Sequence, residues 1–199
     1  MTKVPFNIPE EKLRHYLRLM EKQKALSTAE KARGDFMQYV HCIWEEFIQG
    51  EHHKIMAQKF NDLATGKIKR LIVNMPPRHT KSEFASFLLP SWLMGRNPKL
   101  KIIQATHTGE LAVRFGRKVR NLMASGEYNQ VFPEVKLRSD SLAAGRWETN
   151  DGGEYFAAGV GGAITGRGAD LMIIDDPHSE QDAMSPSALE NAYEWYTSG

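Results

Sequence analysis

The chain has 199 residues, enough for one sizeable core with an appended helical segment, and its apolar content of 41% and charged content of 25% are ordinary for a soluble globular protein and favour neither a disordered nor a fibrous one. A formal net charge of +2 is too small to indicate nucleic-acid binding by itself, and the single cysteine, Cys42, excludes an intramolecular disulfide and fits a reducing compartment. No apolar run approaches the roughly 20 residues of a spanning helix, and no secretory signal opens the chain, so we expect a cytoplasmic protein without a membrane partner.

Residues 1–66 predict an N-terminal helical segment. Residues 9–33 are highly charged and lack internal proline or glycine, and three apolar side chains fall at helical spacing there. After Gly34, apolar residues recur every three or four positions and predict a second, better buried helix that ends at Gly50. The residues of this repeat are Phe36, Tyr39, Val40, Ile43, Trp44 and Phe47. A third helix is expected over about 54–64.

Beyond this segment, apolar strands alternate with amphipathic helices. The runs RLIVNM (70–75), KIIQAT (101–106) and ADLMIIDD (169–176) are predicted to be strands. Helices are expected after the first two of them, over 82–95 and 107–126. The expected buried stripe of the second helix comprises Leu111, Phe115, Val119 and Leu122.

The segment GRWETNDGGEYFAAG (145–159) predicts a β-hairpin with Asp151-Gly152-Gly153 as its turn. A further helix is expected to begin at Ser185-Pro186. Strands that alternate with helices predict an α/β fold, in which a mostly parallel central sheet carries helices on its faces in three layers. Residues 67–199 would form this core, preceded by the N-terminal helices.

The stretch LIVNMPPRHTKSEF (71–84) places a basic turn between the first strand and its helix. Aligned on Lys81 and Ser82, it resembles the phosphate-binding loop G-x-x-x-x-G-K-[ST], with Met75 and Thr80 at the two glycine positions. Lys81 would reach the β and γ phosphates of ATP, and the Ser82 hydroxyl would ligate Mg²⁺. The alternative is that the stretch is only a basic strand-to-helix turn.

Backbone N–H groups at the start of a helix can bind phosphate without glycine. Two prolines stiffen the exit from the strand, and the loop from Pro77 onward would supply five successive amides. These belong to Arg78, His79, Thr80, Lys81 and Ser82. Arg78 adds a planar guanidinium suited to phosphate oxygens. Because a β-branched side chain resists positive φ, we expect Thr80 at negative φ, and a positive φ there would count against the alignment.

A second motif, LMIIDDPH, ends the third predicted strand in two aspartates. Asp175 would hold Mg²⁺, through water or Ser82, and Asp176 would activate the water that attacks the γ-phosphate. In a parallel sheet both motifs open at the carboxyl edge, where ligands bind. With KIIQAT expected as the strand between the two motif strands, the pattern predicts an enzyme that binds ATP and hydrolyses it with Mg²⁺.

Three runs, in order, resemble the ATPase part of the large terminase subunit of tailed bacteriophages: GKIKRLIVNMPPRHTKSEFAS, ATHTGELAVRFGRKVR and GVGGAITGRGADLMIIDDPH. The loop that begins Pro-Pro-Arg-His is typical of one branch of that family, although most of this branch has a glycine where Thr80 stands. The resemblance covers roughly residues 35 to 190 and implies a P-loop NTPase of the additional-strand type. The family's coupling motif and nuclease domain have no counterpart in these 199 residues, so we expect a fragment without nuclease activity.

The resemblance implies a motor that couples ATP hydrolysis to the translocation of double-stranded DNA into a procapsid. Its implied partners are DNA, the portal protein, the small terminase subunit and copies of itself in a ring. The implied location is the cytoplasm of the infected bacterial host, and not the mature virion. Two alternatives stay open: a helicase-like DNA-dependent ATPase, which the residues after Gly199 would distinguish, and a nucleotide-binding module that docks on the portal without turnover.

The remaining candidates each have a simpler alternative. Arg167, between two glycines, would act as an arginine finger in its own subunit or a neighbour's, or would be a surface arginine; Arg146 is a weaker candidate for this role. His53, or its neighbour His52, lies where the family places its adenine-contacting segment. The basic side chains of RFGRKVR would contact the DNA backbone or form a solvated helix face. They are Arg114, Arg117, Lys118 and Arg120.

Overall fold

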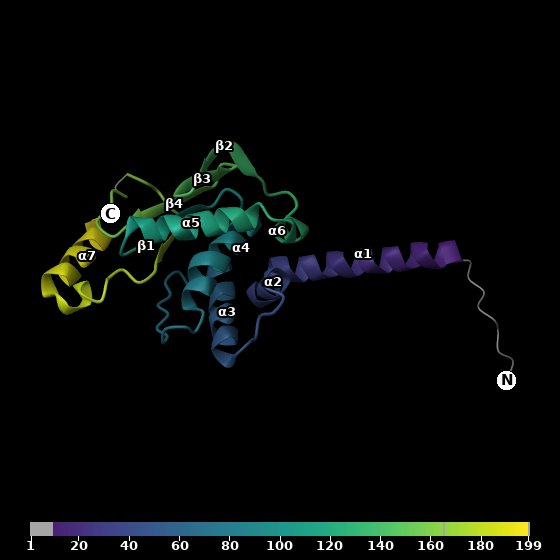
Figure 1. Ribbon diagram of the computed structural model, residues 1–199, viewed down its shortest axis with the longest axis horizontal. Coiled ribbons are helices and arrows are strands. Elements are labelled where there is room, and N and C mark those ends of the chain that lie inside the picture. Colours follow the sequence, from purple (N-terminus) through teal and green to yellow (C-terminus); the bar gives the residue numbers. More distant parts are fainter. Residues whose placement is uncertain (1–9, 165, 199) are drawn as a thin grey trace.

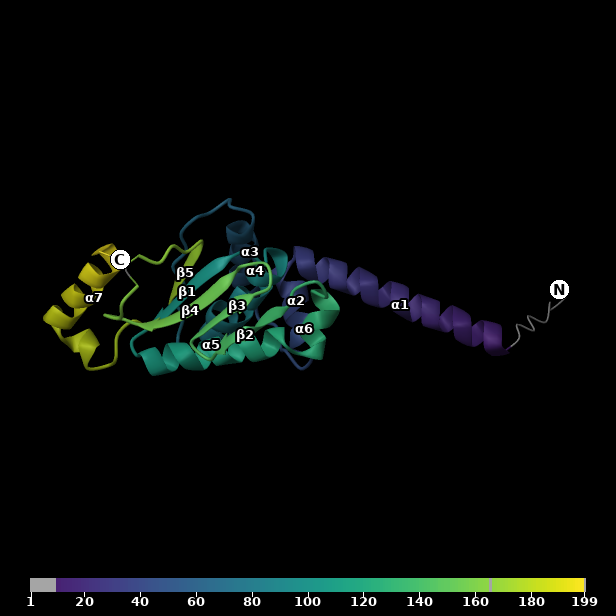
Figure 2. The ribbon, with the colours of Figure 1, turned by 90° about the horizontal axis from the view of Figure 1, so that it is seen from above.

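The computed structural model describes residues 10–164 and 166–198, and a five-stranded mixed sheet lies at its centre (Figure 2). The strand order is β2 (Leu137–Ala143), β3 (Arg146–Thr149), β4 (Glu154–Gly159), β1 (Lys101–Thr106) and β5 (Leu171–Ile174). β1 pairs in parallel with both β4 and β5, whereas β3 pairs antiparallel with both β2 and β4. The mixed α/β class is therefore confirmed, but the sheet is half parallel rather than mostly parallel.

The strands predicted from KIIQAT and ADLMIIDD and the hairpin predicted at 145–159 are confirmed as β1, β5 and β3–β4. Strand β2 was not predicted, because its sequence LRSDSLA is polar and half-buried to exposed, without the apolar pattern of a core strand. It pairs with β3 and so adds a second antiparallel pairing to the hairpin.

The strand predicted at 70–75 is wrong, because this stretch belongs to no strand of the sheet. Its side chains nevertheless alternate in exposure: Leu71, Val73 and Met75 pack against the core, whereas Ile72 is 86% exposed. Packing against the core therefore accounts for part of the apolar run without strand pairing. KIIQAT accordingly lies between β4 and β5, and not between the two motif strands as predicted.

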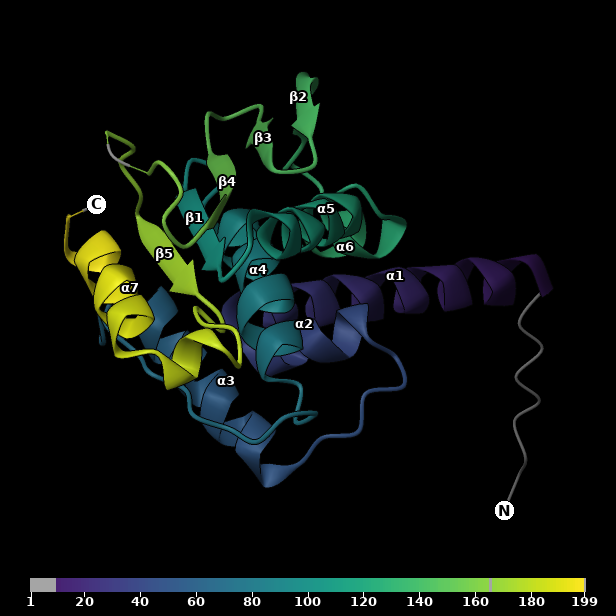
Figure 3. The same cartoon turned by 60° about the vertical axis from the view of Figure 1, so that its left-hand side comes forward.

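Helices cover one face of the sheet. The predicted helix at 82–95 is confirmed as two consecutive parts, the π-helical η1 (Glu83–Leu88) and α4 (Leu89–Arg96), and the helix predicted at 107–126 is confirmed as α5 (Gly109–Met123). Figure 3 shows α4 and α5 together on the same side of the strands, with the short α6 (Gly126–Val131) after α5.

The buried stripe predicted for α5 is shifted along the helix by about one residue. Val119 is buried as predicted, but Leu111, Phe115 and Leu122 are only half-buried. The fully packed positions are Ala112, Gly116, Val119 and Met123. A Cβ on Gly116 would lie 2.5 Å from the carbonyl oxygen of Ala144, so the helix approaches its neighbours with its small side chains.

Three helices form the N-terminal segment: α1 (Glu10–Gly34), α2 (Phe36–Ile43) and α3 (Glu51–Ala64). The second predicted helix ends seven residues early, and residues 44–50 turn back toward α3. α1 extends away from the rest of the molecule (Figures 1 and 2), with only Ala29 and Ala32 buried. In the part of the chain that is described, no helix has both the length and the apolar content needed to span a bilayer.

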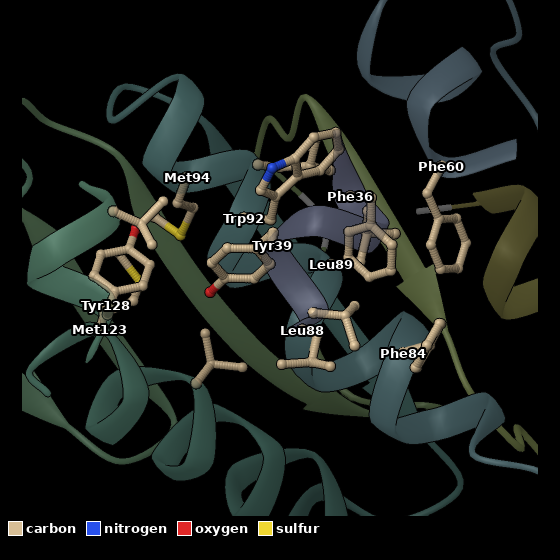
Figure 4. Close-up of a cluster of buried hydrophobic side chains, with 14 of the residues drawn as sticks. Phe36, Tyr39, Phe60, Phe84, Leu88, Leu89, Trp92, Met94, Met123 and Tyr128 are labelled. Atoms are coloured by element: carbon tan, nitrogen blue, oxygen red, sulfur yellow. The ribbon is translucent and has the colours of Figure 1, made fainter. Parts of the chain in front are cut away.

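The N-terminal helices share one core with the helices on the sheet (Figure 4). The Phe36 ring meets those of Phe60 and Trp92 edge to face, with centroids 5.1 and 5.4 Å apart. Such pairs of aromatic rings add to the stabilisation that comes from burying their apolar area. The indole Nε1 of Trp92 also donates to the carbonyl of Ala32, 2.9 Å away, which joins the end of α1 to this core.

The opposite face of the sheet has a smaller cover. Ile103, Ala158 and Ile164 form a separate apolar cluster, and Trp195 packs against it. Trp195 belongs to α7 (Pro186–Ser198), which follows the short η2 (Asp182–Met184) and confirms the helix expected to begin at 185–186. Its Nε1 donates to the carbonyl of Gly162 at 2.8 Å.

Candidate phosphate-binding site

The basic loop and the two aspartates meet at the carboxyl edge of the sheet. The Lys81 ammonium lies 2.7 Å from a carboxylate oxygen of Asp176 and 3.8 Å from one of Asp175, although Lys81 and Asp176 are 95 positions apart in sequence. The hydrogen bond to Asp176, followed by the charges of both aspartates, raises the pKa of Lys81 against the opposing effect of partial burial. The structure therefore brings together the two motifs that the sequence predicted to form one site.

Asp175 is held from inside the protein. Its side chain is 8% exposed, and its Oδ2 accepts a hydrogen bond of 2.8 Å from the Ser86 hydroxyl. The amide Nε2 of Gln104, on β1, donates in turn to the Ser86 oxygen at 3.2 Å. Because buried charged groups need such partners, this chain of hydrogen bonds fixes the position of the Asp175 carboxylate.

Ser86 and Gln104 were not identified from the sequence. Ser86 lies four positions after Ser82, in the π-helical η1, and no motif singles it out. Side chains of strand β1 alternate between the two faces of the sheet, and this places Gln104 on the face that the helices cover. That alternation is the one signal in the sequence that could have suggested an inward polar group. Ser82 itself, predicted to ligate the metal, is half-buried at the start of this helix.

Asp176 differs from Asp175 in exposure and backbone. Its side chain is 61% exposed, and its φ of 46° lies in the left-handed region, which aspartate tolerates better than most residues. Its carbonyl oxygen accepts a hydrogen bond of 3.1 Å from the backbone N–H of His107, just after β1. Strained backbone of this kind is common at functional sites.

Thr80 has a φ of 61°, so the prediction of negative φ is wrong, and by the criterion stated above this counts against the alignment. The physical reason is that the Thr80 hydroxyl is bonded on both sides: it lies 2.6 Å from His53 Nε2 and 2.6 Å from the carbonyl oxygen of His79. These hydrogen bonds offset the strain of a β-branched residue in this region. The left-handed conformation is also the one that a glycine at this position would adopt readily.

The loop backbone is open to an anion. Arg78, like Thr80, has positive φ, at 64°, and His79 between them does not. Alternation between right-handed and left-handed backbone is typical of anion-binding nests, in which successive N–H groups face one side. Within the described residues, the N–H groups of residues 78–82 donate to no other backbone or side-chain group. Pro77 contributes its carbonyl, which lies 2.9 Å from Nδ1 of His79.

His53, expected to contact adenine, has protein partners on every side. Its Nδ1 accepts from the backbone N–H of Gly50 at 2.8 Å, its Nε2 bonds to Thr80, and its ring packs against those of Phe47 and Phe84. Neither ring nitrogen remains free for a base.

Arg167, expected as an arginine finger, is not brought to this edge. Its guanidinium lies 3.2 Å from Glu154 and 3.8 Å from the ring centre of Phe156, and Arg146 lies 2.8 Å from the same Glu154. Glu154 pairs with Lys101 at the start of β1, five residues before Thr106, or roughly 16 Å along the strand from the Lys81 edge.

The basic side of α5 is only partly free. Arg114 and Arg117 are exposed, but Lys118 forms an ion pair with Glu83, and Arg120 is half-buried and donates to the carbonyl of Leu142. Two of the four side chains expected on an exposed basic face are therefore engaged within the protein.

The groups at the Lys81 edge fit magnesium better than a transition metal. The residues that could hold Mg²⁺, which are Asp175, Asp176 and Ser82, all offer oxygen atoms, and Mg²⁺ is commonly bound by one or two carboxylates together with substrate phosphates. In residues 10–164 and 166–198, no group of three or more His, Cys, Asp and Glu side chains is arranged to hold a metal ion. The edge thus fits a metal that arrives with a phosphate ligand.

Comparison with known proteins adds no relative from which a role could be transferred. The chain matches no protein-family model, and no curated protein is similar to it in sequence. The candidate site therefore rests on the residues and their geometry.

Proposed function

We propose that this chain is an ATPase, the nucleotide-binding part of a viral DNA-packaging motor of the terminase type. The observation that carries the proposal is the meeting of Lys81 with Asp175 and Asp176 beside a loop of unbonded backbone N–H groups. The proposed fold is a three-layer P-loop NTPase of the additional-strand type. A basic turn of purely structural importance would have no need of two converging carboxylates.

The roles follow from position and charge. The loop from Pro77 to Ser82 would surround the phosphates, and Lys81 would exchange Asp176 for phosphate oxygens. Mg²⁺ held by Ser82 and Asp175 would neutralise phosphate charge. Asp176, freed from Lys81, would accept a proton from the water that attacks the γ-phosphorus, and the bond to the bridging oxygen of ADP would break.

The wider assignment rests on the family resemblance. It proposes double-stranded DNA, the portal protein, the small terminase subunit and further copies of this chain in a ring as partners. It also proposes the cytoplasm of an infected bacterial host as the place of action, and not the mature virion. Arg114 and Arg117 are the free cations on α5 that could contact a DNA backbone in this arrangement.

One observation favours a second candidate, a portal-docking module that binds nucleotide without turnover. Arg167 is held by Glu154 away from the Lys81 edge, so the expected arginine is missing from the site within one copy of the described chain. In P-loop NTPases that use an arginine finger, the rate of phosphoryl transfer depends strongly on that arginine.

Mg²⁺-dependent ATP hydrolysis, measured over a range of protein concentrations beside Lys81→Ala, tests both candidates. Turnover that rises faster than linearly with concentration and disappears in Lys81→Ala supports the motor with an arginine from a neighbour. Binding without turnover, lost in Lys81→Ala, supports the docking module. If neither protein binds ATP, the loop is only a turn and the proposal fails.

A further inference from the structure

The loop that carries Lys81 is strained at Thr80. A β-branched residue at a φ of 61° costs energy that a glycine would not, so the surrounding structure must hold it. Thr80 is also the first acceptor of the following helix, since its carbonyl receives the N–H of Phe84 at 3.0 Å. Its conformation therefore sets the direction in which Lys81 and the helix leave the loop.

A directed chain of hydrogen bonds joins Thr80 to the start of α3. The backbone N–H of Gly50 can only donate, so His53 Nδ1, 2.8 Å away, must accept and carry no proton. The proton of the neutral ring then lies on Nε2, which donates to the Thr80 oxygen at 2.6 Å. The Thr80 hydroxyl proton remains for the carbonyl of His79, also at 2.6 Å. With these proton positions each donor has an acceptor, and the hydrogen bonds all run from Gly50 through His53 and Thr80 to His79.

The His53 ring is itself firmly placed. It is 5% exposed, and its centroid lies 4.8 Å from that of Phe47 and 5.0 Å from that of Phe84. Burial, followed by the nearby charges of His52 and His79, lowers the pKa of His53 and favours the neutral ring that the chain requires. A protonated ring would set an N–H against the N–H of Gly50.

We propose that His53 is a positioning residue: through Thr80 it holds the Lys81 loop in its phosphate-binding conformation, and so does the work that a glycine would do at that position. The role in phosphate binding rests on the proposed function. The hydrogen bonds that join Gly50, His53 and Thr80, which we call the clamp, do not depend on it. It assigns the α2–α3 region a part in the site without direct contact between His53 and the nucleotide.

A double-mutant cycle between His53→Ala and Thr80→Gly tests the clamp, with two measurements. The first is the rate of tryptic cleavage after the exposed Arg78, in the absence of nucleotide, and the second is the dissociation constant for ATP with Mg²⁺. We expect His53→Ala to speed cleavage and weaken binding about fivefold, the effect of one hydrogen bond. In the Thr80→Gly background, the same change should alter both by less than about twofold, since glycine adopts positive φ unaided.

Two further variants serve as controls. Ile55→Ala changes an exposed side chain of α3, two residues from His53, and should leave both measurements within about twofold. His53→Gln, whose amide can donate to the Thr80 oxygen, should recover part of the loss. Circular dichroism confirms that each variant is folded before it is compared.

Equal effects of His53→Ala in both backgrounds would overturn the clamp, because they would mean that His53 acts only by packing. If the clamp appears in the cleavage rates but the unmodified protein does not bind ATP, the clamp stands and the proposed function fails. If ATP binding depends on Lys81 but neither measurement shows coupling, the proposed function stands and the clamp fails.

Discussion

Two clusters of three charged side chains lie at opposite ends of the sheet. At the carboxyl edge, the cation Lys81 lies between two carboxylates, Asp175 and Asp176. At the amino end of β4, the carboxylate Glu154 lies between two cations, Arg146 and Arg167. The clusters have nearly opposite composition. Lys81 and Asp176 are 95 positions apart in sequence, whereas the contacts of Glu154 span only 8 and 13 positions.

The clusters differ in what surrounds them. Lys81 lies beside unbonded backbone N–H groups and a carboxylate that Ser86 fixes from inside, and the net charge of −1 leaves room for a cation. Arg167 is stacked on Phe156, and the backbone N–H groups of Arg167 and Glu154 donate to the carbonyls of Ile164 and Leu100. An ion pair alone therefore does not indicate a phosphate-binding site. The Lys81 cluster is distinguished by the unbonded backbone N–H groups beside it and by the Asp175 carboxylate that Ser86 holds.

Lys81→Ala, in the cluster at the carboxyl edge, should have the largest effect of these substitutions, and the effect should be on ATP affinity. Loss of its charge leaves two carboxylates facing an incoming phosphate, and we expect ATP affinity to fall more than about 100-fold, since charged hydrogen bonds are the strong ones. Isothermal titration with ATP and Mg²⁺ measures this, with the exposed Lys99→Ala as control. Equal affinity in the two variants would contradict the site.

Ser86→Ala should act through Asp175. The change leaves a buried carboxylate oxygen without its donor, so we expect the free energy of unfolding to fall by about 1–3 kcal/mol and the Mg²⁺ concentration for half-maximal binding to shift several-fold. Ser91→Ala is a matched control, because Ser91 is equally buried but bonds to Tyr39 instead. A shift in Mg²⁺ dependence in both variants would show that the effect is not specific.

Glu154→Gln should affect only the second cluster. Both ion pairs are partly exposed, so solvent screening limits their contribution, and we expect the free energy of unfolding to fall by about 1 kcal/mol or less. Chemical denaturation measures this fall. ATP affinity should stay unchanged, and a loss of affinity would mean that the two ends of the sheet are coupled.

Arg167→Ala should have the smallest effect in dilute protein. Because Arg167 lies roughly 16 Å along the strand from the Lys81 edge, hydrolysis per copy at low concentration should not change. A fall confined to high concentration, where copies can meet, would identify Arg167 as the arginine supplied to a neighbour. A fall at every concentration would contradict the placement described above.

The sequence predicted that Lys81 lies close to Asp175 and Asp176, but it did not predict the backbone that leads to Lys81. RLIVNM and ADLMIIDD have the same local pattern, yet only the second forms a strand. Local pattern records a preference for extended, half-buried backbone, whereas strand formation also needs a neighbouring edge in register. For residues 71–75 that partner is not among the five strands of the sheet.

The parts of the site that were missed depend on contacts between distant residues. Ser86 reaches Asp175 across 89 positions, and His53 reaches Thr80 across 27. Neither distance follows from spacing along one helix or strand. The conformation of Thr80 was mispredicted for the same reason: intrinsic preference argued for negative φ, and a side-chain hydrogen bond from another helix outweighed it.

The extended α1 has a mechanical consequence. Its 25 residues span about 37 Å, and its two buried alanines and its hydrogen bond to Trp92 all lie near its C-terminal end. A load applied near Glu10 would therefore act on that attachment as a lever acts on its pivot. The resulting torque would pass into the aromatic core around Trp92 and Phe36, and Phe36 is in ring contact with Phe84, one turn of helix beyond the Lys81 loop.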